Sequence, residues 1–260
     1  MLKIMSFNIR YGQANDGDNS WPRRRELVIG RIRAHDPDLI GLQECRDDDQ
    51  AAYVRAALPD YEFFGVARGG NGPTAPEMAP VLWRRATFDL RQRGVFWLSE
   101  TPDIPGSVGW DALFPRPATW VELAHRPSGR PLAFLNTHFD LMPQAILDSA
   151  RLLRGWAERM AARLPLVITG DFNAGKTSAA YAMLADGATL ADAWRRANPA
   201  GGDETTYHDF GRPEAAAAID WVLASPALAV AAAQIDRARP DGRYPSDHDP
   251  VVVALADTHI

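Results

Sequence analysis

The sequence carries at residues 166–173 the stretch Leu166-Val167-Ile168-Thr169-Gly170-Asp171-Phe172-Asn173, which decides the fold prediction. Its short apolar run is typical of a buried strand. Gly170 allows a sharp turn, after which Asp171 and Asn173 emerge at the end of the strand. A carboxylate next to an amide suits a metal-bound phosphate or the water that attacks it. A plain Asp/Asn turn explains this stretch equally well, so the other polar strand ends must decide.

Polar side chains also flank the other predicted strands. Three predicted strands, over 2–9, 39–43 and 131–136, have a polar side chain at or just after their ends: Asn8, Glu44 and His138. Two more, over 219–223 and 251–255, have such side chains at or just before their starts: Asp220, Asp247 and His248. For all to share one edge, some strands must run toward it and others away. This arrangement predicts mixed or antiparallel sheets rather than a purely parallel doubly wound sheet.

The shared edge would gather four carboxylates, two histidines and two amides. Burying so many charged groups without a cation would be very costly. Oxygen ligands favour a hard divalent cation, and Mg²⁺ is the natural candidate. The sequence therefore predicts a magnesium site at this edge.

Helices are expected over 21–35, about 50–58, 146–164 and about 178–184, from helical apolar spacing and flanking prolines. Shorter strands are expected over 81–83, 95–98 and 120–123. Two irregular segments, 99–119 and 194–214, are expected to determine substrate choice. With no internal repeat and no linker-like composition, we expect one domain over residues 1–260.

Composition narrows the function class. The chain has 260 residues, is 46% hydrophobic and has a net charge of −5, which does not fit a dedicated nucleic-acid binder. Its single cysteine, Cys45, cannot form an internal disulfide and fits a reducing compartment. No apolar run approaches the ~20 residues of a membrane span, and no signal-peptide pattern follows Met1. We expect a cytoplasmic monomer without stable membrane association.

Other kinds of catalytic site are less favoured. Histidines and cysteines are not paired at the spacing of a zinc site, and the Gly-x-Ser-x-Gly elbow of serine hydrolases is absent. Gly175-Lys176-Thr177 resembles the end of a phosphate-binding P-loop, which we keep as an unfavoured alternative.

Six motifs in order resemble those of the endonuclease/exonuclease/phosphatase superfamily, whose members include DNase I, abasic-site endonucleases, inositol polyphosphate 5-phosphatases, neutral sphingomyelinases and CCR4-type deadenylases. The motifs are Ser6-Phe7-Asn8-Ile9-Arg10, Leu42-Gln43-Glu44, Asn136-Thr137-His138, Gly170-Asp171-Phe172-Asn173, Ile219-Asp220 and Ser246-Asp247-His248-Asp249-Pro250. A further block, Phe96 to Pro102, resembles small bacterial members. The resemblance implies an α/β protein with a four-layer, DNase I-like sandwich: two packed mixed or antiparallel sheets flanked by helices.

The resemblance also implies metal ligands and catalytic roles. Glu44 would be the principal Mg²⁺ ligand, helped by Asn8 and Asp247, with Mn²⁺ as a substitute. Asp171 would position or activate the attacking water, and Asn173 would contact the phosphate. His248, oriented by Asp220, would act as a base or as a phosphate-stabilising group.

His138 matches a second histidine of DNase I-like members, and Glu77 matches the carboxylate that supports it. We expect a Glu77–His138 hydrogen bond that fixes the imidazole tautomer and favours its charged form. Which histidine acts as acid and which as base stays open. Substrate-binding candidates are Arg116 and Trp110 in the first irregular segment and His208 in the second.

We therefore expect a Mg²⁺-dependent hydrolase of phosphate mono- or diesters. The chain is acidic and Lys176 is the only lysine of its second half, so a small soluble phosphoester or a short single-stranded nucleic acid is favoured over duplex DNA. A DNA endonuclease or exonuclease and a sphingomyelinase-like phosphodiesterase are the alternatives. A non-catalytic binding domain is less favoured, because every motif position is filled.

Overall fold

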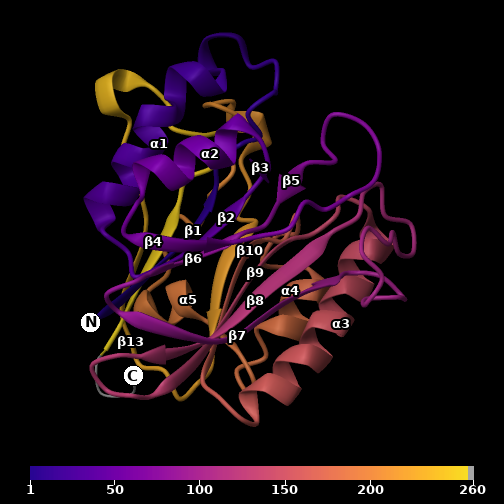
Figure 1. Cartoon of the computed structure of the whole chain (residues 1–260), viewed down its shortest axis with the longest axis vertical. Helices are drawn as coiled ribbons and strands as arrows, with labels where there is room; N and C mark the ends of the chain where they lie inside the picture. The colour runs from indigo at the N-terminus through magenta and orange to yellow at the C-terminus, as the bar shows by residue number, and fades with distance from the viewer. Residues whose placement is uncertain (257–260) are drawn as a thin grey trace.

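The computed structural model describes residues 1–256 and consists of two β-sheets packed face to face, with helices covering both outer faces (Figure 1). The first sheet has the order β13 (Val230–Ile235), β14 (Val251–Leu255), β1 (Leu2–Asn8), β2 (Leu39–Gln43), β6 (Val81–Arg84), β4 (Tyr61–Phe64). The second has the order β11 (Ala191–Asp192), β12 (Asp220–Ala224), β10 (Leu166–Asp171), β9 (Pro131–His138), β8 (Pro117–His125), β7 (Phe88–Trp97). A two-stranded ribbon joins β3 (Cys45–Arg46) to β5 (Glu77–Met78).

Both large sheets are mixed, as the sequence predicted. The pairs β1–β2 and β9–β10 are parallel, and the other pairs are antiparallel. Each parallel pair is joined through a long helix, α1 (Trp21–His35) in the first sheet and α3 (Pro143–Ala161) in the second. The remaining helices are α2 (Asp49–Ala57), α4 (Ala179–Leu184) and α5 (Ala193–Ala197), with short 3₁₀ turns at Gly17–Asn19, Pro213–Ala215 and Pro240–Gly242. The four-layer α/β fold is confirmed.

Three apolar cores hold the layers together. The central core joins the two sheets and includes Phe134 and Val253. An outer core packs Val28 and Ile32 of α1 on the first sheet, and another packs Leu153 of α3 on the second. None of the helices within residues 1–256 has the length and apolar composition that crossing a bilayer requires.

A buried polar bridge crosses the sheet interface. Asn136 Oδ1 accepts hydrogen bonds from Gln43 Nε2 at 2.6 Å and from Thr169 Oγ1 at 3.0 Å, and its Nδ2 donates to the Leu42 carbonyl at 2.6 Å. Gly41 makes this close approach possible, because a Cβ there would lie 2.1 Å from Thr169 Oγ1. The bridge fixes β2, β9 and β10 against one another just before they end.

Several boundaries differ from the sequence prediction. Strand β7 starts at Phe88 rather than at 95, and β8 starts at Pro117, so the irregular segment is shorter than 99–119. Strands β4, β11 and β13, the β3–β5 ribbon and helix α5 were not predicted. Strands β1, β2, β9 and β10 all end at one edge, and β12 and β14 begin on the same side, which is where the polar motif residues meet.

Candidate active site

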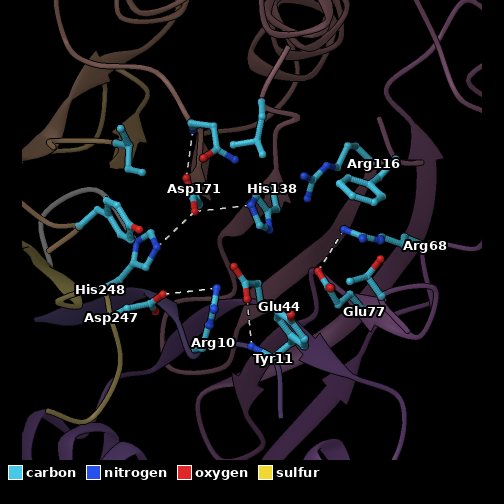
Figure 2. Close-up of a pocket in the computed structure, with 16 residues that line it drawn as sticks. Arg10, Tyr11, Glu44, Arg68, Glu77, Arg116, His138, Asp171, Asp247 and His248 are labelled. Atoms are coloured by element: carbon cyan, nitrogen blue, oxygen red, sulfur yellow. Dashed lines mark hydrogen bonds and ion pairs between the residues drawn. The ribbon is translucent and has the colours of Figure 1, made fainter. Parts of the chain in front are cut away.

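A cavity of about 380 Å³ opens at the edge where these strand ends meet (Figure 2). Its lining includes Glu44 from the β2 end, His138 from the β9 end and Asp171 from the β10 end. Asp247 and His248 reach it from the segment before β14. The cavity therefore straddles both sheets.

Asp171 Oδ2 is the oxygen on which the cluster converges. It accepts a hydrogen bond from Asn8 Nδ2 at 3.0 Å and lies 3.5 Å from His138 Nε2 and 3.7 Å from His248 Nε2. Asn8 Nδ2 also donates to Glu44 Oε1 at 3.1 Å, so this one amide links the first sheet to the second. Burial and the charge of nearby Asp220 raise the pKa of Asp171 above its ordinary value.

The two histidines beside Asp171 differ in charge. His248 Nδ1 lies 2.8 Å from Asp220 Oδ2; burial acts to lower the pKa of His248, but the charges of Asp220, Asp171 and Asp247 raise it well above its ordinary value. Burial and the charges of Arg116 and Arg68 lower the pKa of His138 well below its ordinary value. His248 is therefore held protonated and His138 neutral.

The expected Glu77–His138 pair was wrong. Glu77 Oε2 instead accepts a hydrogen bond from Arg68 Nη1 at 3.0 Å, and burial with the charge of Glu44 raises the pKa of Glu77. Both residues line the cavity, but residues 1–256 show no hydrogen bond between them. The expectation of a charged His138 was also wrong, because burial, followed by the charges of Arg116 and Arg68, lowers its pKa.

Two donor sets are candidates for a cation. Ligand atoms of Asp171, Asp220 and His248 lie within 4.8 Å of one another. In that set His248 Nδ1 is already bonded to Asp220, and a protonated imidazole offers no lone pair to a metal. The other candidate set is Glu44 and Asp247, which line the cavity, with Asn8, whose Oδ1 accepts from the Arg10 N–H at 2.9 Å; oxygen donors of this kind match the preference of hard divalent cations. Burial, with the charge of nearby Glu44, raises the pKa of Asp247 above its ordinary value, although Arg10 Nη1 lies 3.6 Å from its Oδ2.

Two residues of the site, Glu44 and Asn173, have an unusual backbone conformation. Glu44 has a φ of 59° and Asn173 a φ of 47°, in the left-handed region that costs energy for residues other than glycine. Asn173 tolerates this conformation better than most residues, and its N–H donates to Asp171 Oδ1 at 3.0 Å. Glu44 is fixed by the Tyr11 N–H, which donates to Oε2 at 2.9 Å.

The segment from Gly170 to Thr177 has the full Gly-x4-Gly-Lys-Thr spacing, so spacing alone does not exclude a P-loop. The structure argues against one. Lys176 Nζ lies 2.7 Å from Asp192 Oδ2 and also contacts Glu204, and its side chain is 6% exposed. This lysine is neutralised and faces away from a phosphate loop.

The model of the endonuclease/exonuclease/phosphatase family matches residues 5–248. The chain belongs to this family. A family protein from Bacteroides vulgatus superposes with a TM-score of 0.89 at 34% identity and 98% coverage of both chains. A Bacteroides thetaiotaomicron mannosyl-6-phosphatase superposes with a TM-score of 0.87 at 30% identity, covering 98% of this chain and all (100%) of that one.

Curated family members include longer proteins. The Ccr4 exoribonuclease subunit of Emericella nidulans is 24% identical in an alignment of 236 positions that covers 69% of this chain and 35% of that protein. The chain thus spans about a third of that relative. The family consists of metal-dependent phosphoesterases and nucleases, and this member is an enzyme of that class.

Two of the three predicted substrate-binding residues do not line the cavity. Trp110 lies outside it, with its N–H bonded to Glu100, and His208 Nε2 lies 3.3 Å from Asp249 Oδ1 and contacts Arg239. Arg116 does line the cavity. Both misplaced residues were chosen by type within an irregular segment, where spacing gives no side-chain direction.

The sequence did not single out Arg68 and Asp140. Arg68 lines the cavity from the loop after β4, and Asp140 holds the adjoining segment by accepting from the Leu113 N–H at 3.1 Å and the Phe114 N–H at 3.2 Å. Asp140 stands two residues after His138, and that closeness to a motif was the signal available for it.

Proposed function

We propose that this family member is a Mg²⁺-dependent hydrolase of a small soluble phosphoester, acting by water attack at phosphorus. The observation that carries the proposal is the position of Asp171. It lies between a protonated and a neutral histidine and bridges through Asn8 to the oxygens of Glu44.

The chain's own groups have distinct roles in this proposal. Glu44, Asn8 and Asp247 would hold Mg²⁺, with Mn²⁺ as a substitute, and the cation supplies charge neutralisation for the phosphate. Asp171 accepts the proton of the attacking water, a task for which its raised pKa suits it near neutral pH.

Groups around Asp171 would hold the phosphate. His248, kept protonated by Asp220, donates to a phosphate oxygen or to the leaving oxygen. Asn173 Nδ2 is fixed by donating to the Phe139 carbonyl at 2.9 Å, and its second N–H is directed to the phosphate in this proposal. His138 is neutral and would accept or donate one hydrogen bond, and Glu77 sets the charge around it through Arg68.

The size of the cavity supports a small substrate. A volume of about 380 Å³ is near the lower end of ligand pockets and holds a phosphate with one modest substituent. The similarity to a mannosyl-6-phosphatase agrees with this choice. A nuclease is the second candidate, favoured by the Ccr4 relative, and a sphingomyelinase-like activity is the third. A single domain, a monomeric state and a cytoplasmic location stay predictions.

One assay panel tests the proposal. The protein with Mg²⁺ is given sugar phosphates, nucleotides, single-stranded RNA, duplex DNA and sphingomyelin, and we expect turnover of the sugar phosphates or nucleotides, abolished by EDTA. The variants Glu44→Gln and His248→Ala should each lower kcat by about 10²–10⁴-fold. The matched control Glu62→Gln, at a half-exposed carboxylate on β4, should leave kcat unchanged. Full activity of Glu44→Gln would overturn the metal assignment, and turnover of duplex DNA alone would overturn the substrate class.

A further inference from the structure

Two buried arginines lie next to the same phenyl ring in the wall of the candidate active site. Arg68 Cζ lies 4.4 Å from the centroid of the Phe114 ring and Arg116 Cζ lies 5.4 Å from it. The side chains of Arg68 and Arg116 are 4% and 5% exposed, and both line the cavity beside His138 (Figure 2). Each buried charge has one carboxylate partner, Glu77 at 3.0 Å from Arg68 and Asp140 at 3.2 Å from Arg116.

The existing partners leave hydrogen-bonding capacity on both guanidinium groups. Arg68 donates through Nη1 to Glu77, and its buried Nε has no partner among residues 1–256. Arg116 donates through Nε to Asp140 at 3.2 Å, and no other hydrogen bond from its guanidinium group occurs in that range. Several N–H groups of this wall are thus available to an anion.

Other residues hold the two arginines in place. Asp140, 1% exposed, binds Arg116 together with two backbone N–H groups of the segment that carries Phe114. On the other side, Trp97 Nε1 donates to the Arg68 carbonyl at 2.9 Å. Trp97 belongs to the block that resembles small bacterial family members, so this block has a structural task in positioning Arg68.

Charge balance indicates what the arginines bind. The cavity lining contains four carboxylates, Glu44, Glu77, Asp171 and Asp247, and three guanidinium groups, those of Arg10, Arg68 and Arg116. With protonated His248 and one divalent cation the lining has an excess of two positive charges. Without Arg68 and Arg116 this excess would vanish, and the cavity would lose its net attraction for a doubly charged phosphate.

We propose that Arg68 and Arg116 bind the terminal oxygens of a phosphomonoester dianion and make this enzyme a phosphomonoesterase. This inference rests on the proposed function and specifies its substrate class. A monoester presents three non-bridging oxygens and about two negative charges near neutral pH, and planar guanidinium forks match such a group. A diester has one charge fewer and only two non-bridging oxygens, so it offers the two guanidinium groups a weaker and less complete set of acceptors.

The test compares a monoester with a diester of the same leaving group. We expect the wild-type protein with Mg²⁺ to hydrolyse p-nitrophenyl phosphate with a higher kcat/KM than bis-p-nitrophenyl phosphate. In Arg116→Gln and Arg68→Gln, which remove the guanidinium charge but keep a polar side chain, kcat/KM for the monoester should fall about 10- to 100-fold, and at least tenfold more than for the diester. An equal fall for both substrates, or a wild-type preference for the diester, would overturn the inference.

Further variants separate specific from general effects. Arg93→Gln is the matched control, because Arg93 also stacks on a phenyl ring, that of Phe64 at 4.6 Å, but lies outside the cavity; its selectivity should equal that of the wild type. Trp97→Phe should raise KM for the monoester with little change in kcat, and Arg116→Lys should keep part of the selectivity. Folding of each variant is checked by its melting temperature, and if Arg116→Gln does not fold, Arg116→Lys and Trp97→Phe carry the test.

A binding measurement distinguishes failure of this inference from failure of the proposed function. Inorganic phosphate is titrated calorimetrically into the Mg²⁺-loaded wild-type, Arg68→Gln and Arg116→Gln proteins. Weaker binding to both variants with no turnover of any phosphoester would support the arginine site and contradict the hydrolase. Turnover of phosphoesters with unchanged phosphate affinity in both variants would support the hydrolase and overturn the arginine site.

Discussion

At the scale of single residues, the motif side chains reach the cavity as the sequence predicted, but their partners do not follow from the motifs. Asn8, Glu44 and Asp171 meet because each stands at a strand end whose direction the sequence indicates. The partner of Glu77 depends instead on how a Gly- and Pro-rich loop folds back, where the Arg68 N–H donates to the Glu77 carbonyl at 2.8 Å. Spacing along the chain does not determine such a loop path.

The Arg68–Glu77 pair should appear as an energetic coupling. Both side chains are buried, so Glu77→Gln and Arg68→Gln should each destabilise the protein by about 3–5 kcal/mol, because each leaves one charge unpaired. The double variant should cost at least about 1 kcal/mol less than the sum of the two. Free energies of unfolding from urea titration measure this. Glu77→Gln and His138→Ala should be additive within about 0.5 kcal/mol, and coupling there instead would restore the pair first expected from sequence.

At the scale of secondary-structure elements, the buried strands could be predicted and the exposed ones could not. Strand β14 is an unbroken apolar run and β10 begins as one, and both were found at or within a residue or two of their ends. Residues 89–93 of β7 are exposed and mostly polar, and β13 is alanine-rich and half exposed, so neither shows the alternation of a half-buried strand. They are strands because they pair with β8 and β14, and no local sequence pattern indicates those partners.

The polar bridge between the sheets gives a prediction about Gly41. Gly41→Ala would place Cβ 2.1 Å from Thr169 Oγ1 and 2.4 Å from Asn136 Oδ1, so it should destabilise the protein by about 1–3 kcal/mol or more. Gly30→Ala is the matched control. It lies inside α1 with nothing within 4 Å of the new Cβ, and it should stabilise by about 0.5–1 kcal/mol. Thermal unfolding of both variants checks the pair, and equal melting temperatures would mean that the sheets are not closely packed at Gly41.

At the scale of the whole molecule, one carboxylate ties the first helix to the last strands. Asp236, just after β13, accepts hydrogen bonds from Arg31 Nε at 2.6 Å and contacts His35 Nε2 at 2.8 Å, both on α1. Burial acts to raise the pKa of Asp236, but the hydrogen bonds from His35, Arg31 and the Ala238 N–H hold it well below its ordinary value. These partners lie about 200 residues away in the chain, so no local pattern could indicate them.

The hydrogen bonds to Asp236 should make the free energy of unfolding fall as the pH is lowered. A carboxylate with a lowered pKa in the folded state stabilises above its unfolded pKa of about 3.9 and loses that contribution as the pH falls further. Asp236→Asn should therefore cost about 1–3 kcal/mol at pH 7 and progressively less below about pH 4. Urea titrations between pH 7 and pH 3.5 measure this, with exposed Asp103→Asn as the control. A cost that does not change with pH would assign the effect to packing alone.

The route of the chain through the two sheets has a consequence for its synthesis on the ribosome. All strands of the second sheet come from one continuous stretch, 88–224, whereas the first sheet pairs β1, which precedes that stretch, with β14, which follows it. Because chains emerge N-terminus first, the second sheet can form while β1 still has an open edge. Asp247 and His248, just before β14, are translated after the whole of the second sheet. The nascent chain therefore acquires its catalytic cluster only after the second sheet has been translated, and until then β1 is the edge that a chaperone would have to shield.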